Sequence, residues 1–393
     1  MATKGEAEGI ARRHRGRLVR VLERDGLLAD RRWRTAFADV PRHMFLPRFF
    51  RPVSPTEWAA IDSSDDDWLT QVYANRVLVT QLDGDPARWE LARAGGRISG
   101  VPTSSSSMPA IMAVMLEALD VVDGNQVLEI GTGTGYNAAL LCHRLGADHL
   151  TTVDIDAELV DAARQRLAAI GYRPTCAATD GAAGYPPRAS YDRVVCTCAV
   201  STVPLPWLAQ TRPGGIVVTT LNRPLGAGLV RITVDADGTG QGRVLADDGR
   251  FMPLRAHRRH LDEQLVARLG DAQGATRDTE VAASVVASPN SPFEFFAGLH
   301  LPGTLPASIG SDTVLLVHQD GSWARHRTED GRHQVTEGGP RRLWDTVEKA
   351  YVQWSELGRP RRSRFGITVG PSGQELWLDT PDSPYRWSLG QTS

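Results

Sequence analysis

An apolar run that ends in three closely spaced glycines constrains this chain more than any other segment. Residues 127–136 read VLEIGTGTGY, and one helix length later residues 153–156 read VDID. Such a pattern predicts a buried strand, a turn whose backbone can approach a ligand, and the start of a helix. The sequence therefore predicts a nucleotide-cofactor site in an α/β fold.

The spacing of the glycines favours a nucleoside without phosphates. The dinucleotide motif needs a glycine three positions after Gly133, where this chain has Tyr136. A P-loop needs a lysine in the turn, and the two lysines of the chain, Lys4 and Lys349, lie far from it. Asp154, at the end of the second strand, can hold a ribose diol with two hydrogen bonds. S-adenosylmethionine fits these requirements, and a tight strand-to-helix connection without a ligand is the alternative interpretation.

A second acidic position follows the next predicted strand. Residues 175–178 are the strand, and Asp180-Gly181 comes directly after it. In open α/β sheets, ligands bind at the carboxyl edge of the parallel strands. We therefore expect Asp180 to lie at the same edge as Asp154 and the glycine turn.

The rest of the first 225 residues reads as helices around a parallel sheet. Strand and helix patterns alternate from Gln126 to Leu221, which is typical of right-handed crossovers in a doubly wound sheet. Apolar spacing predicts an amphipathic helix over 109–119 and a first helix over 10–28. Asp30 is placed to cap a second helix that runs to Ala38, and residues 63–67 are expected to form an exposed acidic loop.

The character of the chain changes after residue 225. We predict a smaller α+β domain over 226–393, beside a methyltransferase-sized domain over 1–225. A strand is expected over 229–234 and a helix around 343–354, which ends before Gly358. A hairpin is expected to pair residues 365–369 with 376–378 across the turn at 370–373.

Composition and charge exclude several classes of protein. A net charge of −2 argues against nucleic acid as the main partner. The chain shows neither a membrane-spanning apolar run nor a secretory signal, so we expect a cytoplasmic protein with no membrane partner. Cys196 and Cys198 alternate along an apolar strand and are expected to be core residues; no metal site is expected.

Several motifs together resemble the protein-L-isoaspartate O-methyltransferases over about residues 12–222. Each motif is weak alone, but their order along the chain is specific. They are the segment 40–47, the segment 105–109 where the family has Thr-Ile-Ser-Gln-Pro, the glycine motif, Asp154, residues 179–181 with Gly184, residues 191–195, and residues 213–215.

The resemblance implies a cofactor and a set of site residues. S-adenosylmethionine would be lined by the glycines of the turn, with Asp154 on the ribose and Asp180 at the adenine amino group. Ser107 would lie beside the methyl donor and the acceptor carboxylate. The candidate catalytic residues are Ser105 and Ser107. The residues expected to bind the cofactor are Glu129, Gly131, Gly133, Gly135, Asp154, Asp180 and Gly181.

Departures from the family pattern concern the acceptor side. Four serines, Ser104 to Ser107, replace the usual motif, Met108 stands where glutamine is usual, and a longer insert lies around residues 82–96. The added C-terminal part, including residues 249–255, resembles longer methyltransferases that accompany peptide-maturation clusters. That resemblance implies an aspartate of a cyclised, ribosomally made peptide, of the graspetide or lanthipeptide kind, as substrate.

The expected chemistry needs positioning and not a base. A carboxylate with a pKa of about 4 is already ionised at neutral pH, so methyl transfer from a sulfonium requires no proton removal. Correct alignment can supply about 7 to 11 kcal/mol of the barrier, and Ser107 is expected to orient the carboxylate oxygen. No nucleophile-elbow motif accompanies this serine, which argues against a hydrolase.

Three hypotheses remain open from the sequence. The first is a peptide-tailoring aspartyl O-methyltransferase whose methyl ester closes to a succinimide. The second is a general isoaspartyl repair enzyme with an accessory domain. The third is a non-catalytic cofactor-binding module whose C-terminal part binds a partner. In the first two, the partner is a peptide or protein that carries an aspartyl or isoaspartyl residue.

Overall fold

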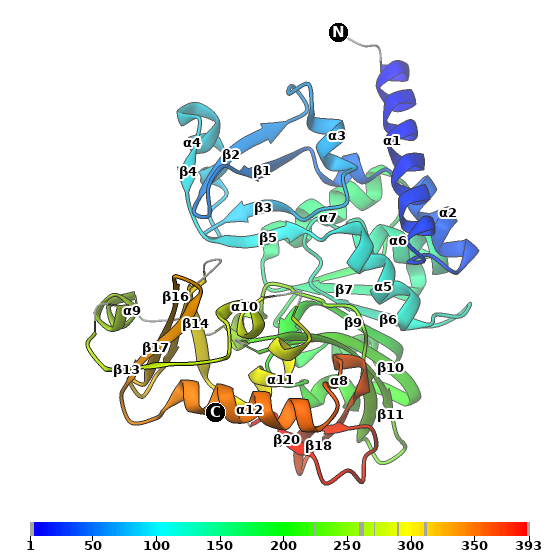
Figure 1. Cartoon of the computed structure of the whole chain (residues 1–393). Helices are drawn as coiled ribbons and strands as arrows, with labels where there is room; N and C mark the ends of the chain where they lie inside the picture. Colours follow the sequence, from blue (N-terminus) through cyan, green and yellow to red (C-terminus); the bar gives the residue numbers. More distant parts are fainter. Residues whose placement is uncertain are drawn as a thin grey trace. The chain divides into compact units, whose positions relative to one another are not determined.

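The computed structural model describes residues 4–223, 225–258, 263–270, 272–288, 291–309 and 313–390. The chain divides into two compact units. The first comprises Met1–Cys198, Pro204–Thr219 and Thr233–Gly238, and the second comprises Ala199–Val203, Thr220–Ile232 and Thr239–Ser393. Figure 1 follows the chain through the elements of both units.

Two helices open the first unit, as the sequence predicts. They are α1 (Lys4–Arg24) and α2 (Arg31–Asp39). The side chain of Asp30 caps α2 by accepting a hydrogen bond from the backbone N–H of Arg32 at 2.7 Å. The residues 63–67 form the exposed turn that was expected, with Ser63, Ser64 and Asp66 in solvent.

A five-stranded antiparallel sheet follows, and the sequence analysis did not predict it. Its strand order is β4-β2-β1-β3-β5, visible in Figure 1 in light blue to cyan. A small core of Phe50, Val79, Leu82 and Trp89 holds it together. The strands are β1 (Arg48–Pro52), β2 (Glu57–Asp62), β3 (Leu78–Leu82), β4 (Ile98–Ser99) and β5 (Pro102–Ser106), and the helices of this region are η1 (Arg42–Phe45), α3 (Trp68–Val72) and α4 (Ala87–Gly95).

The parallel sheet of the first unit confirms the predicted methyltransferase Rossmann-like fold. Its strands run in the order β8-β7-β6-β9-β10, so the order reverses at β6, which pairs in parallel with both β7 and β9. The elements are β6 (Val127–Ile130), α6 (Tyr136–Leu145), η2 (Ala147–His149), β7 (Leu150–Asp154), α7 (Ala157–Ala169), β8 (Thr175–Ala178), η3 (Gly181–Ala183), η4 (Pro186–Arg188), β9 (Tyr191–Val200), α8 (Leu205–Ala209) and β10 (Thr211–Asn222). A ligand site is expected where the strand order reverses.

The helix over 109–119 exists, but it is not amphipathic. Helix α5 (Pro109–Leu119) has its five predicted apolar positions buried, and Pro109, Ala110 and Ala113 are buried as well. Because only Val114, Glu117 and Ala118 keep partial exposure, this helix is buried on nearly all sides.

The second unit contains the predicted hairpin and helix. Strands β18 (Phe365–Gly370) and β19 (Gly373–Leu378) pair Ile367 with Leu376, and Gly370 with Gly373 at the turn. Strand β11 (Ala227–Val234) covers the predicted strand over 229–234, and it is followed in sheet order by β12 (Gly240–Val244), β18, β19 and β20 (Arg386–Ser388). The predicted helix is α12 (Leu343–Glu356), which buries Trp344 and Trp354 in the core of this unit.

A second antiparallel sheet in this unit was not predicted. Its order is β13-β17-β16-β15-β14. The strands are β13 (Ala275–Asp278), β14 (Thr304–Ile309), β15 (Thr313–His318), β16 (Trp323–Glu329) and β17 (Arg332–Gly338), and the remaining helices are η5 (Arg255–His257), α9 (Glu263–Gly270), α10 (Ala283–Val286), α11 (Pro292–His300) and η6 (Arg362–Arg364). None of the helices in the described part of the chain combines the length and apolar character needed to cross a bilayer.

Candidate active site

The glycine turn after β6 has a backbone that only glycine adopts easily. Gly131, Gly133 and Gly135 have φ angles of 97°, 49° and 87°. A Cβ atom on Gly131 would lie 2.6 Å from Oγ1 of Thr197, and one on Gly135 would lie 3.0 Å from Cβ of Ala163. The turn therefore leaves a surface of bare backbone at the carboxyl end of β6.

Asp154 ends β7 beside this turn, as the sequence predicts. Its Oδ2 atom accepts a hydrogen bond from the Gly133 N–H at 2.9 Å, and Oδ1 accepts one from the Asp156 N–H at 3.3 Å. Burial is the largest effect on this carboxyl and raises its pKa. A carboxylate offers about four acceptor positions, so Asp154 keeps capacity for two hydroxyl donors.

Glu129 lies below the turn in a buried chain of hydrogen bonds. Its Oε1 accepts from Nδ2 of Asn137 at 2.8 Å, and its Oε2 accepts from the Thr152 hydroxyl at 2.6 Å. Thr132 Oγ1 lies 2.7 Å from Thr152 Oγ1 and extends the chain into the turn. Burial raises the pKa of Glu129 to about 7. This network connects β6, β7 and α6, and three of its members were not found from the sequence.

The loop after β8 carries Asp180 and Gly181. Asp180 is exposed and accepts a hydrogen bond from the Ala182 N–H at 3.0 Å, which caps η3. Gly181 is buried, and its carbonyl oxygen accepts from the indole N–H of Trp207 at 2.8 Å. Gln210 fixes the end of the loop by accepting from the Tyr185 N–H at 2.7 Å. Two residues of a later segment therefore hold the loop in place.

The four serines alternate along and beyond β5. Ser104 and Ser106 are buried, whereas Ser105 and Ser107 are half-buried. Ser104 Oγ accepts from the Thr80 hydroxyl at 3.2 Å. Within the described residues, the hydroxyls of Ser105 and Ser107 have no protein partner. A Cβ atom on Gly133 would lie 3.6 Å from the carbonyl oxygen of Ser105, so β5 packs directly against the glycine turn.

Arg42 anchors the serine segment from inside the protein. This side chain is fully buried, and its guanidinium donates to the Ser107 carbonyl at 3.0 Å and to the Ser106 hydroxyl at 3.3 Å. It also donates to the Val72 carbonyl at 2.7 Å. Burial lowers its pKa to about 10, so it remains charged at neutral pH. The sequence analysis included this arginine in the segment 40–47 but assigned it no role.

Only one of the two cysteines of β9 is a core residue. Cys196 is buried, but Cys198 is half-buried. A Cβ atom on Gly131 would lie 3.0 Å from its sulfur, so Cys198 borders the glycine turn. The expectation that both are core residues was wrong for Cys198, because its side chain borders the glycine turn and not the core. No group of three metal-ligating side chains is found among the described residues.

Known proteins share these features. A family model described as protein-L-isoaspartate(D-aspartate) O-methyltransferase matches residues 96–258. A protein-L-isoaspartate O-methyltransferase of Thermococcus onnurineus is 32% identical over 203 residues, which cover 51% of this chain and 74% of that relative. The chain belongs to the protein-L-isoaspartate O-methyltransferase family.

Other matches to this family differ in extent. A protein-L-isoaspartate O-methyltransferase of Ignicoccus hospitalis is 43% identical over 114 residues, so the chain spans about half, 54%, of that relative. A solved structure of a protein-L-isoaspartate O-methyltransferase aligns with a TM-score of 0.53 at 21% identity, covering 93% of this chain and 100% of that one. At this identity the likeness establishes the fold.

Proposed function

We propose that the chain is an S-adenosylmethionine-dependent carboxyl O-methyltransferase that acts on the free carboxylate of an aspartyl or isoaspartyl residue. One observation carries the proposal: the bare backbone of the glycine turn lies between Asp154 on one side and the serine strand β5 on the other. A donor site and an acceptor site would therefore share the same turn. Family membership supports the same reaction.

The residues around the turn fit the cofactor. The absence of side chains at Gly131 and Gly135 lets the turn pack closely against Thr197 and Ala163, and the free acceptor positions of Asp154 suit a ribose diol. Asp180 and Gly181 would lie at the adenine, and Glu129 would support the turn from below. The cofactor would supply an electrophilic methyl group on a positively charged sulfur.

The serines would orient the acceptor. Ser105 and Ser107, with hydroxyls that no described protein group engages, would donate to one carboxylate oxygen and direct the other towards the methyl group. Arg42 holds the Ser107 backbone and so acts as a positioning residue. Strong bonding to the carboxylate would stabilise the ground state, so orientation and not tight binding is expected to raise the rate.

For the substrate, we favour an isoaspartyl residue of a peptide or protein, as in repair. The free carboxylate of such a residue is its α-carboxyl group, since the chain continues through the side chain. Once this α-carboxylate is methylated, the next backbone nitrogen can attack the ester carbonyl, methanol leaves, and a succinimide forms. Water then opens the succinimide. This proposal relies on the family and on the match across residues 96–258.

A second candidate is methylation of an aspartate in a cyclised, ribosomally made peptide. Two features favour it: the run Ser104 to Ser107 departs from the family motif, and the chain continues well beyond residue 258. In that case, residues 226–393 would act as an accessory domain for peptide recognition, and the succinimide would be the product.

Two measurements test these proposals. Calorimetry should detect binding of S-adenosylmethionine and S-adenosylhomocysteine but not of NAD or ATP; the opposite pattern would overturn the cofactor assignment. Mass spectrometry should then detect a gain of one methyl group on a linear isoaspartyl peptide and not on its aspartyl counterpart. Preference for a cyclised aspartyl peptide would favour the second candidate, and donor binding without turnover on any peptide would favour a non-catalytic module.

A further inference from the structure

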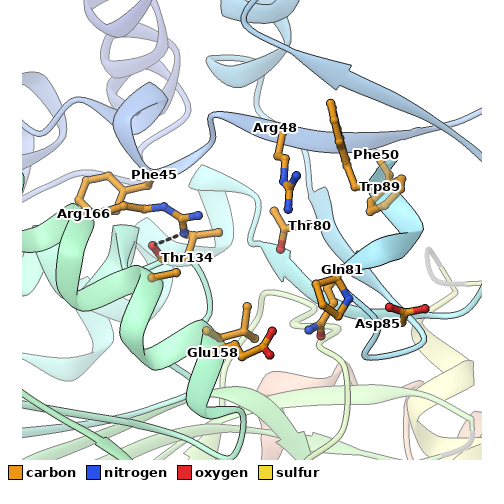
Figure 2. A pocket seen from close by; sticks show the side chains of 13 residues that line it. Phe45, Arg48, Phe50, Thr80, Gln81, Asp85, Trp89, Thr134, Glu158 and Arg166 are labelled. Carbon is orange, nitrogen blue, oxygen red and sulfur yellow. Dashed lines mark hydrogen bonds between the residues drawn. The ribbon is translucent and has the colours of Figure 1, made fainter. Parts of the chain in front are cut away.

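A pocket of about 150 Å³ lies in the first unit, between the antiparallel sheet and α7. Strand β1 contributes Arg48 and Phe50, and α7 contributes Arg166 (Figure 2). The segment around residues 82–96, where the sequence predicts an insert relative to the family pattern, contributes Asp85 and Trp89. The pocket is therefore built partly from a segment in which a departure from the family is expected.

Arg166 is the less satisfied of the two arginines that line the pocket. It is half-buried, and its Nη1 donates only to the Thr134 carbonyl, at a long 3.4 Å. Among the described residues it makes no ion pair with a carboxylate. Burial lowers its pKa, and the charge of Arg48 lowers it further. An anion between the two arginines would remove this repulsion.

Arg48 closes the same side of the pocket. Its guanidinium stacks on the ring of Trp89, with 4.9 Å from Cζ to the ring centroid, and its Nη1 donates to Glu90 at 3.0 Å on the exposed side. The two carboxylates that line the pocket, Asp85 and Glu158, are both exposed. Figure 2 shows Asp85 at the far end from Arg166, near Trp89 and Phe50, and Glu158 between the two ends. The end of the pocket at Arg166 is therefore positively charged.

The pocket adjoins the candidate active site through two contacts. Thr134, which lines the pocket, follows Gly133 in the glycine turn. Thr80, which also lines it, donates to Ser104 on the serine strand. A group held in the pocket would therefore be a near neighbour of the acceptor position.

We propose that this pocket binds the carboxylate side chain of an aspartate or glutamate that lies close to the acceptor residue in the substrate chain. The proposal rests on the proposed methyltransferase function and adds a rule for its substrates. The volume suits one side chain, since pockets for whole small ligands measure about 300 to 1,000 Å³. Arg166 and Arg48 would bind the carboxylate, and Phe50 and Trp89 would pack on the methylenes of the side chain.

Peptide kinetics test the rule. Isoaspartyl hexapeptides would carry either glutamate or glutamine at each position next to the acceptor. The full-length protein should use the best glutamyl peptide with a kcat/KM about tenfold above that of its glutaminyl counterpart. Arg166→Gln and Arg48→Gln should each reduce this ratio to about twofold or less. Arg164→Gln is the control, because Arg164 lies on the same helix but pairs with Asp161 outside the pocket.

A binding assay separates this proposal from the function on which it rests. Phenylglyoxal modifies accessible arginines, and peptide mass spectrometry reports its rate at Arg166. The glutamyl peptide should slow that modification several-fold, and the glutaminyl peptide should not. If the glutamyl peptide protects Arg166 but no peptide is methylated, the proposed methyltransferase function is contradicted and the pocket proposal is not.

Two results would overturn the pocket proposal. One is methylation of all peptides at equal rates, without protection of Arg166. The other is a loss of affinity for S-adenosylhomocysteine in Arg166→Gln that is as large as its loss in kcat/KM for the glutamyl peptide. In that case, Arg166 would only support the glycine turn through Thr134.

Discussion

At the scale of single residues, the buried acid Glu129 makes the stability of the first unit depend on pH. Burial raises the pKa of Glu129 from 4.5 to about 7, so the native state holds this proton more tightly than the unfolded state. The resulting stabilisation is complete below pH 4.5 and is lost as the pH rises through 7. At about 1.4 kcal/mol per pKa unit, the loss amounts to about 3 kcal/mol.

We therefore expect Glu129→Gln to flatten the fall in unfolding free energy between pH 5 and pH 8. Urea unfolding at several pH values measures this slope. Asp66→Asn, at an exposed position of the loop before α3, should keep the slope of the unmodified protein. An unchanged slope in Glu129→Gln would mean that Glu129 is already ionised in the folded protein at pH 5.

A second prediction for a single residue concerns replacement of the buried Arg42 by lysine. Arg42 reaches Val72 with Nη1 and reaches Ser106 and Ser107 with Nη2, and a lysine, whose three donors share one nitrogen, cannot reproduce this planar fork. Arg42→Lys should therefore lower the unfolding free energy by about 2 to 4 kcal/mol. In the fraction that folds, kcat should fall while the affinity for S-adenosylhomocysteine stays within about twofold. The exposed Arg76→Lys is the matched control; a similar fall in both variants would exclude a specific role for Arg42.

The sequence identifies residues whose chemistry is local and misses residues whose partners are distant. The three glycines and Asp154 were predicted because strand, turn and acid follow one another along the chain. Arg42 was missed because its partners Ser106 and Ser107 lie more than 60 positions away. The same reason applies to Thr152, which reaches Glu129 across neighbouring strands.

At the scale of elements, the glycine turn gives a prediction with an internal control. Gly131 and Gly124 both have positive φ, 97° and 86°, but a Cβ on Gly131 would contact Thr197 while one on Gly124 meets nothing within 4 Å. Both alanine variants should be destabilised by about 1 to 3 kcal/mol through backbone strain. Only Gly131→Ala should also weaken S-adenosylhomocysteine binding, by at least tenfold in a calorimetric titration. Equal binding by both variants would remove the turn from the cofactor site.

Elements with a clear apolar period were predicted, and short polar strands were not. Strand β8 was predicted with its observed limits, and the hairpin β18–β19 with its turn. Strand β5 reads PTSSS and β13 reads ATRD, so neither carries an apolar alternation. The polar strands β5 and β13 were missed for this reason, and with β5 the surroundings of Ser105 and Ser107. The apolar strands β3 (LVTQL) and β15 (TVLLVH) were also missed, because a short apolar run by itself does not distinguish a strand from a segment of a buried helix.

At the scale of the whole molecule, the candidate site lies entirely within the first unit. A change that destabilises only the second unit should therefore leave binding of the methyl donor unchanged. In the second unit, Arg250 donates to the buried Glu294 at 2.5 Å. Arg250→Met would leave this acid buried without its partner and should cost about 3 to 5 kcal/mol in that unit. The affinity for S-adenosylhomocysteine should not change, since Gly131, Gly133 and Asp154 belong to the first unit.

The same variant tests the proposed accessory role of residues 226–393. If that part recognises peptides, Arg250→Met should raise the KM for a peptide substrate while donor binding stays constant. The double variant Arg250→Met with Glu294→Leu should recover much of the stability, because it removes the unpaired acid. Unchanged peptide kinetics in a destabilised variant would argue against peptide recognition by this part.

The serine strand belongs to the antiparallel sheet, while the glycine turn belongs to the parallel one. In the proposed reaction, two sheets with separate backbone hydrogen bonding would thus bind the two reactants, and each sheet could vary without rebuilding the other. Libraries randomised only at surface positions of β1, β3 and α4 should therefore yield catalysts retargeted to new peptides, with their use of the methyl donor unaltered.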